Sequence, residues 1–417
     1  MRKASILLLI LILAALGLPQ GLFAAADGMI AKTFPMKMGG TLDLKIDSRG
    51  DIEITGWDRE EVAVTVNIGG EDGDKVNVEF DAGASGLKIR SDCGKHTHCE
   101  CDVRFAINAP AKCDIAVDSR GGGIDVEGIE GVLSGKTMGG ALELTRIKGE
   151  IHLSTMGGSV TVEDSEASGK VSTMGGRVLI RNVKGNLKGS TMGGKVTYEG
   201  VSGRSAESED EEMNISTRGG DIEISDTPNK VNAKTYGGDI NVGKAKEVNV
   251  TTMGGDIDVE EAPEGAQVTT MGGDIDIRSA GKYVKAKTMG GDIEVGAIDG
   301  GAEVTTMGGD ITITMVGDPQ KGDRSVDLSS LGGKIELALP AAISAKFDIE
   351  LSYTKGKENR YEIKSDFPLE IKKSDKWEGH RFSSKRKYIY GTGTVGGGEH
   401  LIKIKTINGD VIIKKGS

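Results

Sequence analysis

The sequence predicts an all-β protein, built as a parallel β-solenoid (β-helix) of about twelve 18-residue coils with β-strand caps at both ends. Two observations support this: the tetrapeptide Thr-Met-Gly-Gly recurs every 18 residues, and apolar residues alternate with polar ones between its copies. A fixed short period is typical of one supersecondary unit stacked on copies of itself. Full copies begin at Thr137, Thr155, Thr173, Thr191, Thr252, Thr270, Thr288 and Thr306, and variants begin at Ser119, Thr217, Thr235 and Ser330.

Residues 1–26 have the pattern of a secretory signal peptide. Arg2 and Lys3 precede a short apolar run, and Ala24, Ala25 and Ala26 offer a small-residue cleavage site. The run is shorter than the ~20 residues that a membrane span needs. We therefore expect an exported protein, whether periplasmic, cell-surface or secreted, that does not span the membrane once the signal is cleaved.

Charge and composition exclude some classes of binding partner. The formal net charge is −11, which argues against nucleic acid because phosphate binding requires a basic surface. Aromatic residues make up only 4%, which leaves little material for stacking on sugar rings or bases.

One coil can be read from residues 252–269. Ile257 and Val259 alternate with Asp256 and Asp258, as in a strand with one buried face. A turn around residues 263–265 leads into a second short alternating strand, and the next tetrad turns the chain again. Two strands and two turns in 18 residues are typical of one solenoid coil.

Two columns of residues should form the core, because both are apolar in every coil. A register slip of one residue would move all of these side chains to the wrong face. The first column holds Leu142, Val160, Val178, Val196, Ile222, Ile240, Ile257, Ile275, Ile293, Ile311 and Ile335. The second holds Leu144, Val162, Ile180, Tyr198, Ile224, Val242, Val259, Ile277, Val295, Ile313 and Leu337.

The tetrad itself has the features of a structural corner. We expect its glycines to supply positive φ for a tight arc. Its Thr falls in phase with inward residues, so the hydroxyl needs a partner, either a corner carbonyl or the Thr one coil away. Its Met either packs over the edge of the core or forms an exposed thioether row open to a partner or to oxidants.

Two longer spacings predict loops on one edge of the solenoid. The interval from Thr191 to Thr217 contains an acidic run at residues 207–212, and the interval from Thr306 to Ser330 contains residues 318–323. Either loop is a solvated excursion or a binding loop.

The chain divides into the signal peptide, an N-terminal β cap at residues 27–118, the solenoid at residues 119–339 and a C-terminal β cap at residues 340–417. Residues 76–107 have the pattern of a hairpin, and it carries the Cys/His cluster described below. The segment from Thr406 to Val411 restores the tetrad pattern near the C-terminus. Caps are expected because a solenoid leaves open strand edges at both ends.

Several short motifs resemble one bacterial family, the "putative adhesin" domain family of unknown function, an exported β-solenoid. The motifs are Gly50-Asp51-Ile52, Gly56-Trp57-Asp58-Arg59, Ala109-Pro110, the repeated Gly-Gly-Asp-Ile, Leu339-Pro340 and the segment from Thr406 to Val411. Where the family commonly has Val-Asn-Gly at the turn, this chain usually has Met-Gly-Gly. The resemblance implies a cell-surface or envelope role and brings no catalytic residues with it.

One cluster has a more specific composition: Cys93, His96, His98, Cys99 and Cys101, with Cys113 nearby. An even number of cysteines in an exported protein predicts disulfides, here two bridges with three possible connectivities. The alternative is a metal site, because thiolates and imidazoles suit zinc or copper(I). We expect no other cofactor.

Two charged surfaces also have alternative interpretations. The acidic column is either a solvated face or a divalent-cation site, and consists of Asp221, Asp239, Asp256, Asp274, Asp292 and Asp310. A basic, aromatic C-terminal stretch either protects an exposed edge strand or binds an anionic envelope polymer. Its candidate residues are Lys372, Lys373, Trp377, Arg381, Lys385, Arg386 and Lys387.

We therefore expect a non-enzymatic surface or envelope scaffold, or an adhesin-like protein that binds a glycan or an anionic envelope polymer. One alternative is a metal-binding or redox-responsive envelope protein that uses the Cys93–Cys113 cluster. The other is a glycan-active β-helix enzyme, although the chain has no Gly-x-Ser-x-Gly elbow.

Overall fold

The computed structural model describes residues 28–416 except 84, 94–99, 204–211 and 380–384. The predicted signal peptide and most of the acidic run at residues 207–212 lie outside the described residues. The described chain contains 34 β-strands and one short 3-10 helix, η1 (Gly73–Lys75), so the all-β prediction is confirmed.

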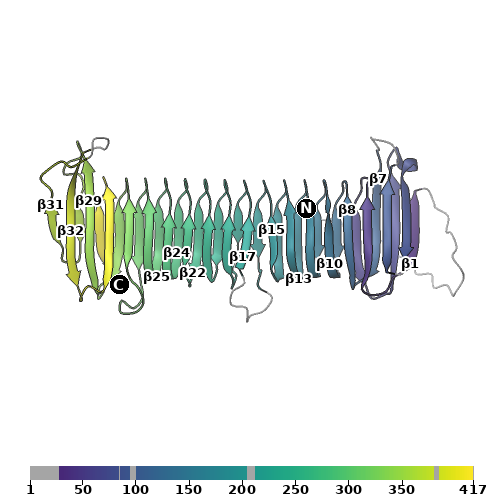
Figure 1. Cartoon of the computed structure of the whole chain (residues 1–417), viewed down its shortest axis with the longest axis horizontal. Helices are drawn as coiled ribbons and strands as arrows, with labels where there is room; N and C mark the ends of the chain where they lie inside the picture. The colour runs from purple at the N-terminus through teal and green to yellow at the C-terminus, as the bar shows by residue number, and fades with distance from the viewer. Residues whose placement is uncertain (1–27, 84, 94–99, 204–211, 380–384, 417) are drawn as a thin grey trace, which may run out of the picture.

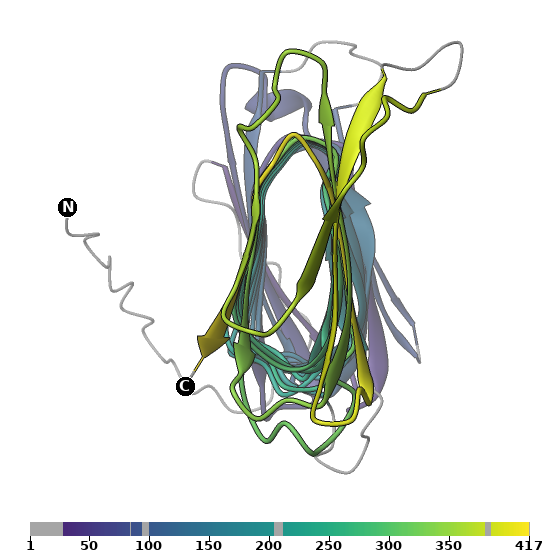
Figure 2. The same ribbon diagram turned by 90° about the vertical axis from the view of Figure 1, so that its left-hand side faces the viewer.

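The chain winds into a long rod with two flat faces. In Figure 1 the strands stand side by side along the rod, and Figure 2 shows the coils end-on as a flattened ring. Each coil places one strand on each face, and strands of successive coils pair in parallel, as for Leu142 with Val160 and Val160 with Val178. The strand partner is therefore the equivalent residue of the next coil.

The strands fall into three groups along the repeat. On face A, with the tetrad at or just after their C-terminal ends, lie β8 (Cys113–Ser119), β10 (Glu130–Thr137), β12 (Lys148–Thr155), β15 (Leu187–Ser190), β17 (Glu212–Ser216), β19 (Lys230–Lys234), β21 (Glu247–Thr251), β23 (Ala266–Thr269), β27 (Val326–Ser330) and β33 (His400–Ile407). On face B lie β9 (Ile124–Glu127), β11 (Leu142–Thr145), β14 (Val178–Lys184), β16 (Val196–Glu199), β18 (Ile222–Ile224), β20 (Ile240–Lys244), β22 (Ile257–Ala262), β26 (Ile311–Met315), β28 (Ile335–Pro340) and β34 (Val411–Gly416). Three long strands continue across both faces: β13 (Val160–Thr173), β24 (Ile275–Lys287) and β25 (Ile293–Thr306).

The two predicted apolar columns form the core of the rod. Every one of their side chains is at most 2% exposed, which confirms the prediction. Burying a Val, Leu or Ile side chain stabilises the fold by about 1.5–3 kcal/mol relative to leaving it exposed. The longer interval between Thr191 and Thr217 does not break the column, because Val196 pairs directly with Ile222.

A hydrogen-bond network fixes each tetrad corner. The Thr173 hydroxyl donates to the Gly158 carbonyl of the preceding coil at 2.7 Å and accepts the N–H of Gly176 at 3.2 Å. The same Thr-to-carbonyl bond recurs at Thr155, Thr191, Thr235, Thr270, Thr288 and Thr306. The inward hydroxyl was expected to bond either a corner carbonyl or the Thr one coil away. In the structure its acceptor is the corner carbonyl.

The reason given for the glycines holds at the variant tetrad of Ser119, where Gly122 has a φ of 90°, but it is wrong for the Thr-Met-Gly-Gly tetrads. The φ angles of the glycines in the Thr-Met-Gly-Gly tetrads, all of them described residues, lie outside the left-handed region. The second glycine is instead required by close stacking, because a Cβ on Gly176 would lie 2.1 Å from the carbonyl oxygen of Gly158. The first glycine has more room: a Cβ on Gly175 would lie 3.6 Å from its nearest neighbour, the Gly157 oxygen.

Residues 76–107 differ from the single hairpin expected for them. Only β5 (Asn77–Gly83) and β6 (Gly86–Asp92) pair as a hairpin. β6 also pairs in parallel with β2 (Gly40–Ile46), whereas β7 (Asp102–Pro110) pairs with β3 (Ile52–Trp57) and β4 (Glu61–Gly69). β6 and β7 thus behave as the two strands of one more coil, because the apolar side of each stacks on the coil of β2 and β3. β1 (Met29–Pro35) adds an antiparallel strand to β4.

At the other end, the tetrad-like segment at Thr406 forms a coil. The Thr406 hydroxyl donates to the Gly333 carbonyl at 2.7 Å, and β33 and β34 pair with β27 and β28. The intervening chain lies outside this coil, where β29 (Ala345–Thr354) pairs with β33 and β32 (Arg386–Val395). β31 (Glu370–Lys373) pairs with β32, and β30 (Ile363–Ser365) pairs with β34.

Candidate functional site

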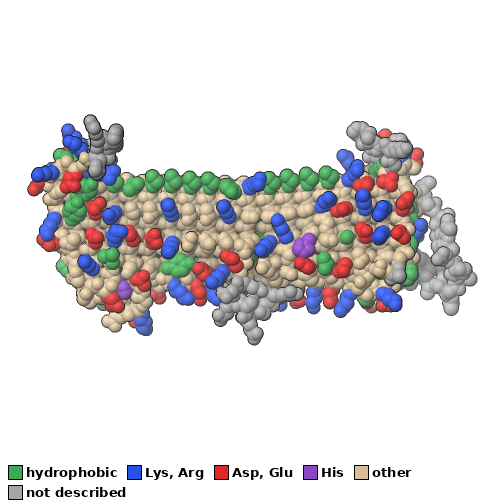
Figure 3. Space-filling model, in the orientation of Figure 1, with side chains coloured by type: hydrophobic (Ala, Val, Ile, Leu, Met, Phe, Trp, Pro, Cys, Tyr) green, Lys and Arg blue, Asp and Glu red, His purple; other side chains and the backbone are tan. Residues whose placement is uncertain are grey.

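The methionines of the tetrads lie on the surface at one long edge of the rod. We call these eight residues the Met row: Met138, Met156, Met174, Met192, Met253, Met271, Met289 and Met307. Their side chains are between 38% and 54% exposed, so of the two interpretations the exposed row is the correct one. Figure 3 shows a line of hydrophobic side chains along this edge, interrupted once by a basic side chain.

The rest of this edge consists of the variant tetrads. Arg218 and Tyr236 separate the Met row into two blocks of four, and Leu331 extends it beyond Met307. Tyr236 and Leu331 are 50% and 47% exposed. The corner therefore accepts residues of different size and charge at this position.

The acidic column has a role that neither interpretation anticipated. Each of its aspartates accepts, through Oδ1, a backbone N–H from the equivalent position of the next coil. For Asp256, Asp274 and Asp292 the bonds to the next aspartate are 2.7–2.8 Å long. The ladder begins at Asp221 and ends with Asp310, which accepts the N–H of Lys334 at 2.7 Å. These carboxylates link neighbouring coils.

Only part of the cysteine cluster lies within the described residues. His96, His98 and Cys99 lie outside the described residues. Cys93 and Cys101 are buried, with their sulfurs 3.3 Å apart, beyond the ~2.0 Å of a disulfide bond between these two atoms. Cys101 and Cys113 are free thiols, whereas Cys93 is disulfide-bonded, so at most one of the two expected bridges is formed.

Cys113 lies at the start of β8, away from this contact. Burial raises the pKa of its thiol to about 12, so it stays protonated and unreactive at neutral pH. The alternating pattern places its side chain in the core column, where a small apolar residue fits. Among the described residues, no group of three or more His, Cys, Asp or Glu side chains is placed to hold a metal ion.

The basic stretch at the C-terminal cap is spread over an edge strand and its neighbour. Lys372 and Lys373 lie exposed on β31, where Lys372 pairs with Glu370 at 2.9 Å. Trp377 lies edge-on to Tyr353 at 6.0 Å, with the Lys387 ammonium 5.5 Å from its ring. Arg386 belongs to β32, Lys385 precedes it and is exposed, and Arg381 lies outside the described residues.

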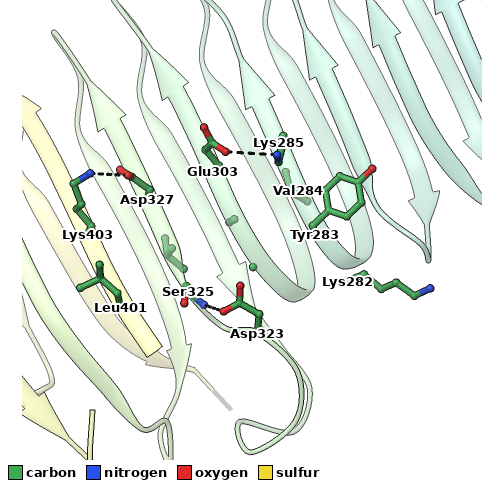
Figure 4. A pocket seen from close by; sticks show the side chains of 13 residues that line it. Lys282, Tyr283, Val284, Lys285, Glu303, Asp323, Ser325, Asp327, Leu401 and Lys403 are labelled. Carbon is green, nitrogen blue, oxygen red and sulfur yellow. Dashed lines mark hydrogen bonds and ion pairs between the residues drawn. The ribbon is translucent and has the colours of Figure 1, made fainter. Parts of the chain in front are cut away.

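A shallow pocket of about 510 Å³ lies on face A near the C-terminal end of the repeat (Figure 4). Its walls carry ion pairs between coils, Lys285 with Glu303 at 3.9 Å and Lys403 with Asp327 at 2.7 Å. Tyr283 donates to Glu247 at 2.7 Å, and burial together with this carboxylate raises the pKa of the phenol to about 12. The ion pairs join neighbouring strands, whereas the Tyr283 bond reaches from β24 to β21 across β23.

Beside the pocket, sequence reasoning missed a buried arginine that anchors the loop at residues 318–323. Arg324 is 2% exposed and donates to the carbonyls of Val316, Asp318 and Lys321 and, at 2.5 Å, to Asp299. Arg324 is two and four residues before the inward Val326 and Leu328, so strand alternation places its side chain inward. This alternation could have identified the buried arginine from the sequence. Arg324 therefore closes the loop on itself through the three carbonyls and links it to the preceding coil through Asp299.

The described part of the chain contains no helix with the length and hydrophobicity that crossing a bilayer requires.

Comparisons with known proteins complete the description. Similar solved structures include a "putative adhesin" of Parabacteroides merdae, with 15% identity over 64% of this chain and 96% of that one and a TM-score of 0.31. They also include a "putative adhesin" of Bacteroides fragilis (16% identity, 65% and 97% coverage, TM-score 0.24) and a "putative lipid binding protein" of Parabacteroides distasonis (15%, 75% and 97%, TM-score 0.24). None of the curated proteins compared with the chain matches it. The family model described as Toastrack DUF4097 matches residues 205–414, just over half of the chain, and the protein therefore belongs to this family.

Proposed function

We propose that the protein is an exported, non-enzymatic, adhesin-like scaffold: a rod of about twelve coils, closed by β caps, that binds a polymer of the cell envelope along its length. The observation that carries this proposal is the Met row. Its eight exposed side chains repeat at the coil spacing, which is about 4.8 Å for hydrogen-bonded strands.

A periodic surface suits a periodic ligand. Each corner contributes only a small apolar contact, but several corners that engage one polymer act together and raise its apparent affinity. The exposed lysines of the C-terminal cap, Lys372, Lys373 and Lys385, offer a second contact for anionic groups of the same polymer.

The test measures retention of the mature protein on envelope fractions and on purified envelope glycans. Replacing Met156, Met174 and Met192 with Ser should weaken retention, because the change removes three neighbouring apolar contacts. The matched control replaces His152, Lys170 and Lys188 with Ser; these are exposed face A side chains whose positions pair in register. Equal retention of the two variants would remove the Met row from the binding surface, and no retention of the unmodified protein would end the proposal.

A second candidate, a redox-responsive envelope protein, is favoured by the free Cys101 thiol, whose sulfur lies 3.3 Å from that of the disulfide-bonded Cys93. Its test is a thiol titration of the denatured protein before and after reduction, with zinc and copper measured by mass spectrometry. An unchanged thiol count and a metal-free protein would exclude this candidate.

A further inference from the structure

The fold does not require methionine at the tetrad corner. At Thr235, where Tyr236 occupies the position, the hydroxyl donates to the Gly220 carbonyl at 2.9 Å. At Ser330, where Leu331 occupies it, the hydroxyl donates to the Gly309 carbonyl at the same 2.9 Å. The corner is thus built by the Thr or Ser hydroxyl and the glycine backbone, and the side chain between them is free to vary.

What distinguishes methionine from leucine at this position is its sulfur. Both are flexible apolar side chains of similar size, and Leu331 is as exposed as the methionines of the row. Only the thioether can accept an oxygen atom and become a sulfoxide, which is a polar group. Eight thioethers on one edge therefore add a reactivity that eight leucines would lack.

Exposure separates the methionines within the described residues into two classes. The Met row is 38–54% exposed, whereas Met36, Met213 and Met315 are 4%, 8% and 1% exposed. Oxidation follows access to the sulfur. The buried three therefore provide an internal reference within the same folded molecule.

We propose that the Met row is a modification site for hydroperoxides, so that the rod serves as a sacrificial oxidant sink. Each thioether sulfur attacks the peroxide, the O–O bond breaks, and one oxygen forms the sulfoxide. The other oxygen leaves as water from hydrogen peroxide, or as the alcohol from an organic hydroperoxide. The sulfur is oxidised by two electrons and the peroxide is reduced by two. Complete reaction of the row consumes eight peroxide molecules per chain.

The rod should survive this reaction because the sulfurs take no part in the core or in the corner network. The bonds that close the corner at Thr173 run between its hydroxyl, Gly158 and Gly176. The backbone of Met174 also links coils, since its carbonyl accepts the N–H of Gly193 at 3.1 Å. An added oxygen points into solvent and leaves all of these bonds intact.

The first experiment treats the folded mature protein with hydrogen peroxide and maps sulfoxides by peptide mass spectrometry over time. We expect the eight row methionines to react before Met36, Met213 and Met315, with an unchanged melting temperature. Equal rates for the two classes, or unfolding during oxidation of the row, would overturn the proposal.

A second experiment uses a variant with all eight row methionines changed to Leu, the residue that the chain itself places at Leu331. Of the ten exposed methionines in the described residues, this variant keeps only Met29 and Met38 and should lose eight of ten oxygen acceptors. In a mixture with a peroxide-sensitive reporter enzyme, the unmodified rod should delay inactivation more than the variant does. Equal protection by two equally folded proteins would exclude the sink. Neither outcome depends on an envelope ligand.

Discussion

At the scale of single residues, the coils tolerate exceptions when a neighbour compensates. Gly189 lies in β15 at an inward position where the two preceding coils carry Leu153 and Val171. Val178, Ile180 and the Tyr198 hydroxyl occupy the space that a larger side chain there would need. The Tyr198 hydroxyl accepts the Gly189 N–H at 2.6 Å and donates to the Leu187 carbonyl at 3.1 Å. Burial raises the pKa of this phenol, so the group stays neutral in the core.

Replacing Tyr198 with Phe should destabilise the rod by about 1–3 kcal/mol, because the Gly189 N–H and the Leu187 carbonyl lose a buried partner. The measurement is the free energy of unfolding in urea. Tyr236→Phe is the matched control, since that hydroxyl belongs to an exposed corner residue. A Tyr198→Phe variant as stable as the control would show that the two bonds contribute nothing.

The two glycines of one tetrad should respond differently to the same change. Gly176→Ala places a Cβ about 2 Å from the Gly158 oxygen and should cost about 2 kcal/mol or more, as overpacking does. Gly175→Ala meets only an ordinary contact and should be tolerated. Thermal unfolding of both variants checks the prediction, and equal destabilisation would contradict the stacking explanation.

At the scale of strands and columns, aspartate has two different roles. The aspartates that follow the glycines accept backbone N–H groups between coils, as Asp274 does from Asp292. Two positions further on, an outward acidic column on face B brings Asp258, Asp276 and Glu294 into register. Here burial first, and then the neighbouring carboxylates, raise the pKa of Asp258 and Asp276.

The raised pKa values in this column predict that the stability of the protein depends on pH. A carboxyl group with a raised pKa in the folded state binds its proton more tightly there than in the unfolded chain. Stability therefore falls as the pH rises through the interval between the ordinary value of 3.8 and the raised value, and then stays lower. Asp258→Asn, which matches Asn241 at the same position of the preceding coil, should be more stable than the unmodified protein at pH 7.

The measurement is the urea midpoint of both proteins between pH 3 and pH 7. Their difference should be largest at pH 7 and shrink toward pH 3, as the carboxyl groups are protonated. A difference independent of pH, or a less stable Asn variant at pH 7, would contradict the role of this column.

At the scale of the whole molecule, the rod is a linear array in which each coil contacts mainly its two neighbours. Such arrays gain or lose whole units without changing the rest. Removing residues 270–287 joins Thr269 to Thr288 and preserves the order of faces. We expect a folded rod shorter by about 4.8 Å, with circular dichroism unchanged in shape.

Deleting only residues 270–278 should be far more damaging, because it removes one strand of the coil and moves the next strand to the wrong face. Solution scattering and circular dichroism of both deletions check this prediction. Similar behaviour of the two deletions would show that coil register is not what specifies the rod.

The sequence by itself determined the all-β class, the coil period, the two core columns and the inward Thr. These follow from spacing and alternation, which repeat many times and leave one register that buries the apolar side chains. It did not determine the direction of the Met row, the steric role of the second glycine, the N–H partners of the aspartates, or the strand partners of β6 and β7. Each of these depends on the position of the backbone one coil away, and only the tertiary structure sets that position. The Met row carries the proposed envelope binding and the proposed oxidant sink. Its repeat was evident in the sequence, but the path of the backbone at the corner decided that its side chains are exposed.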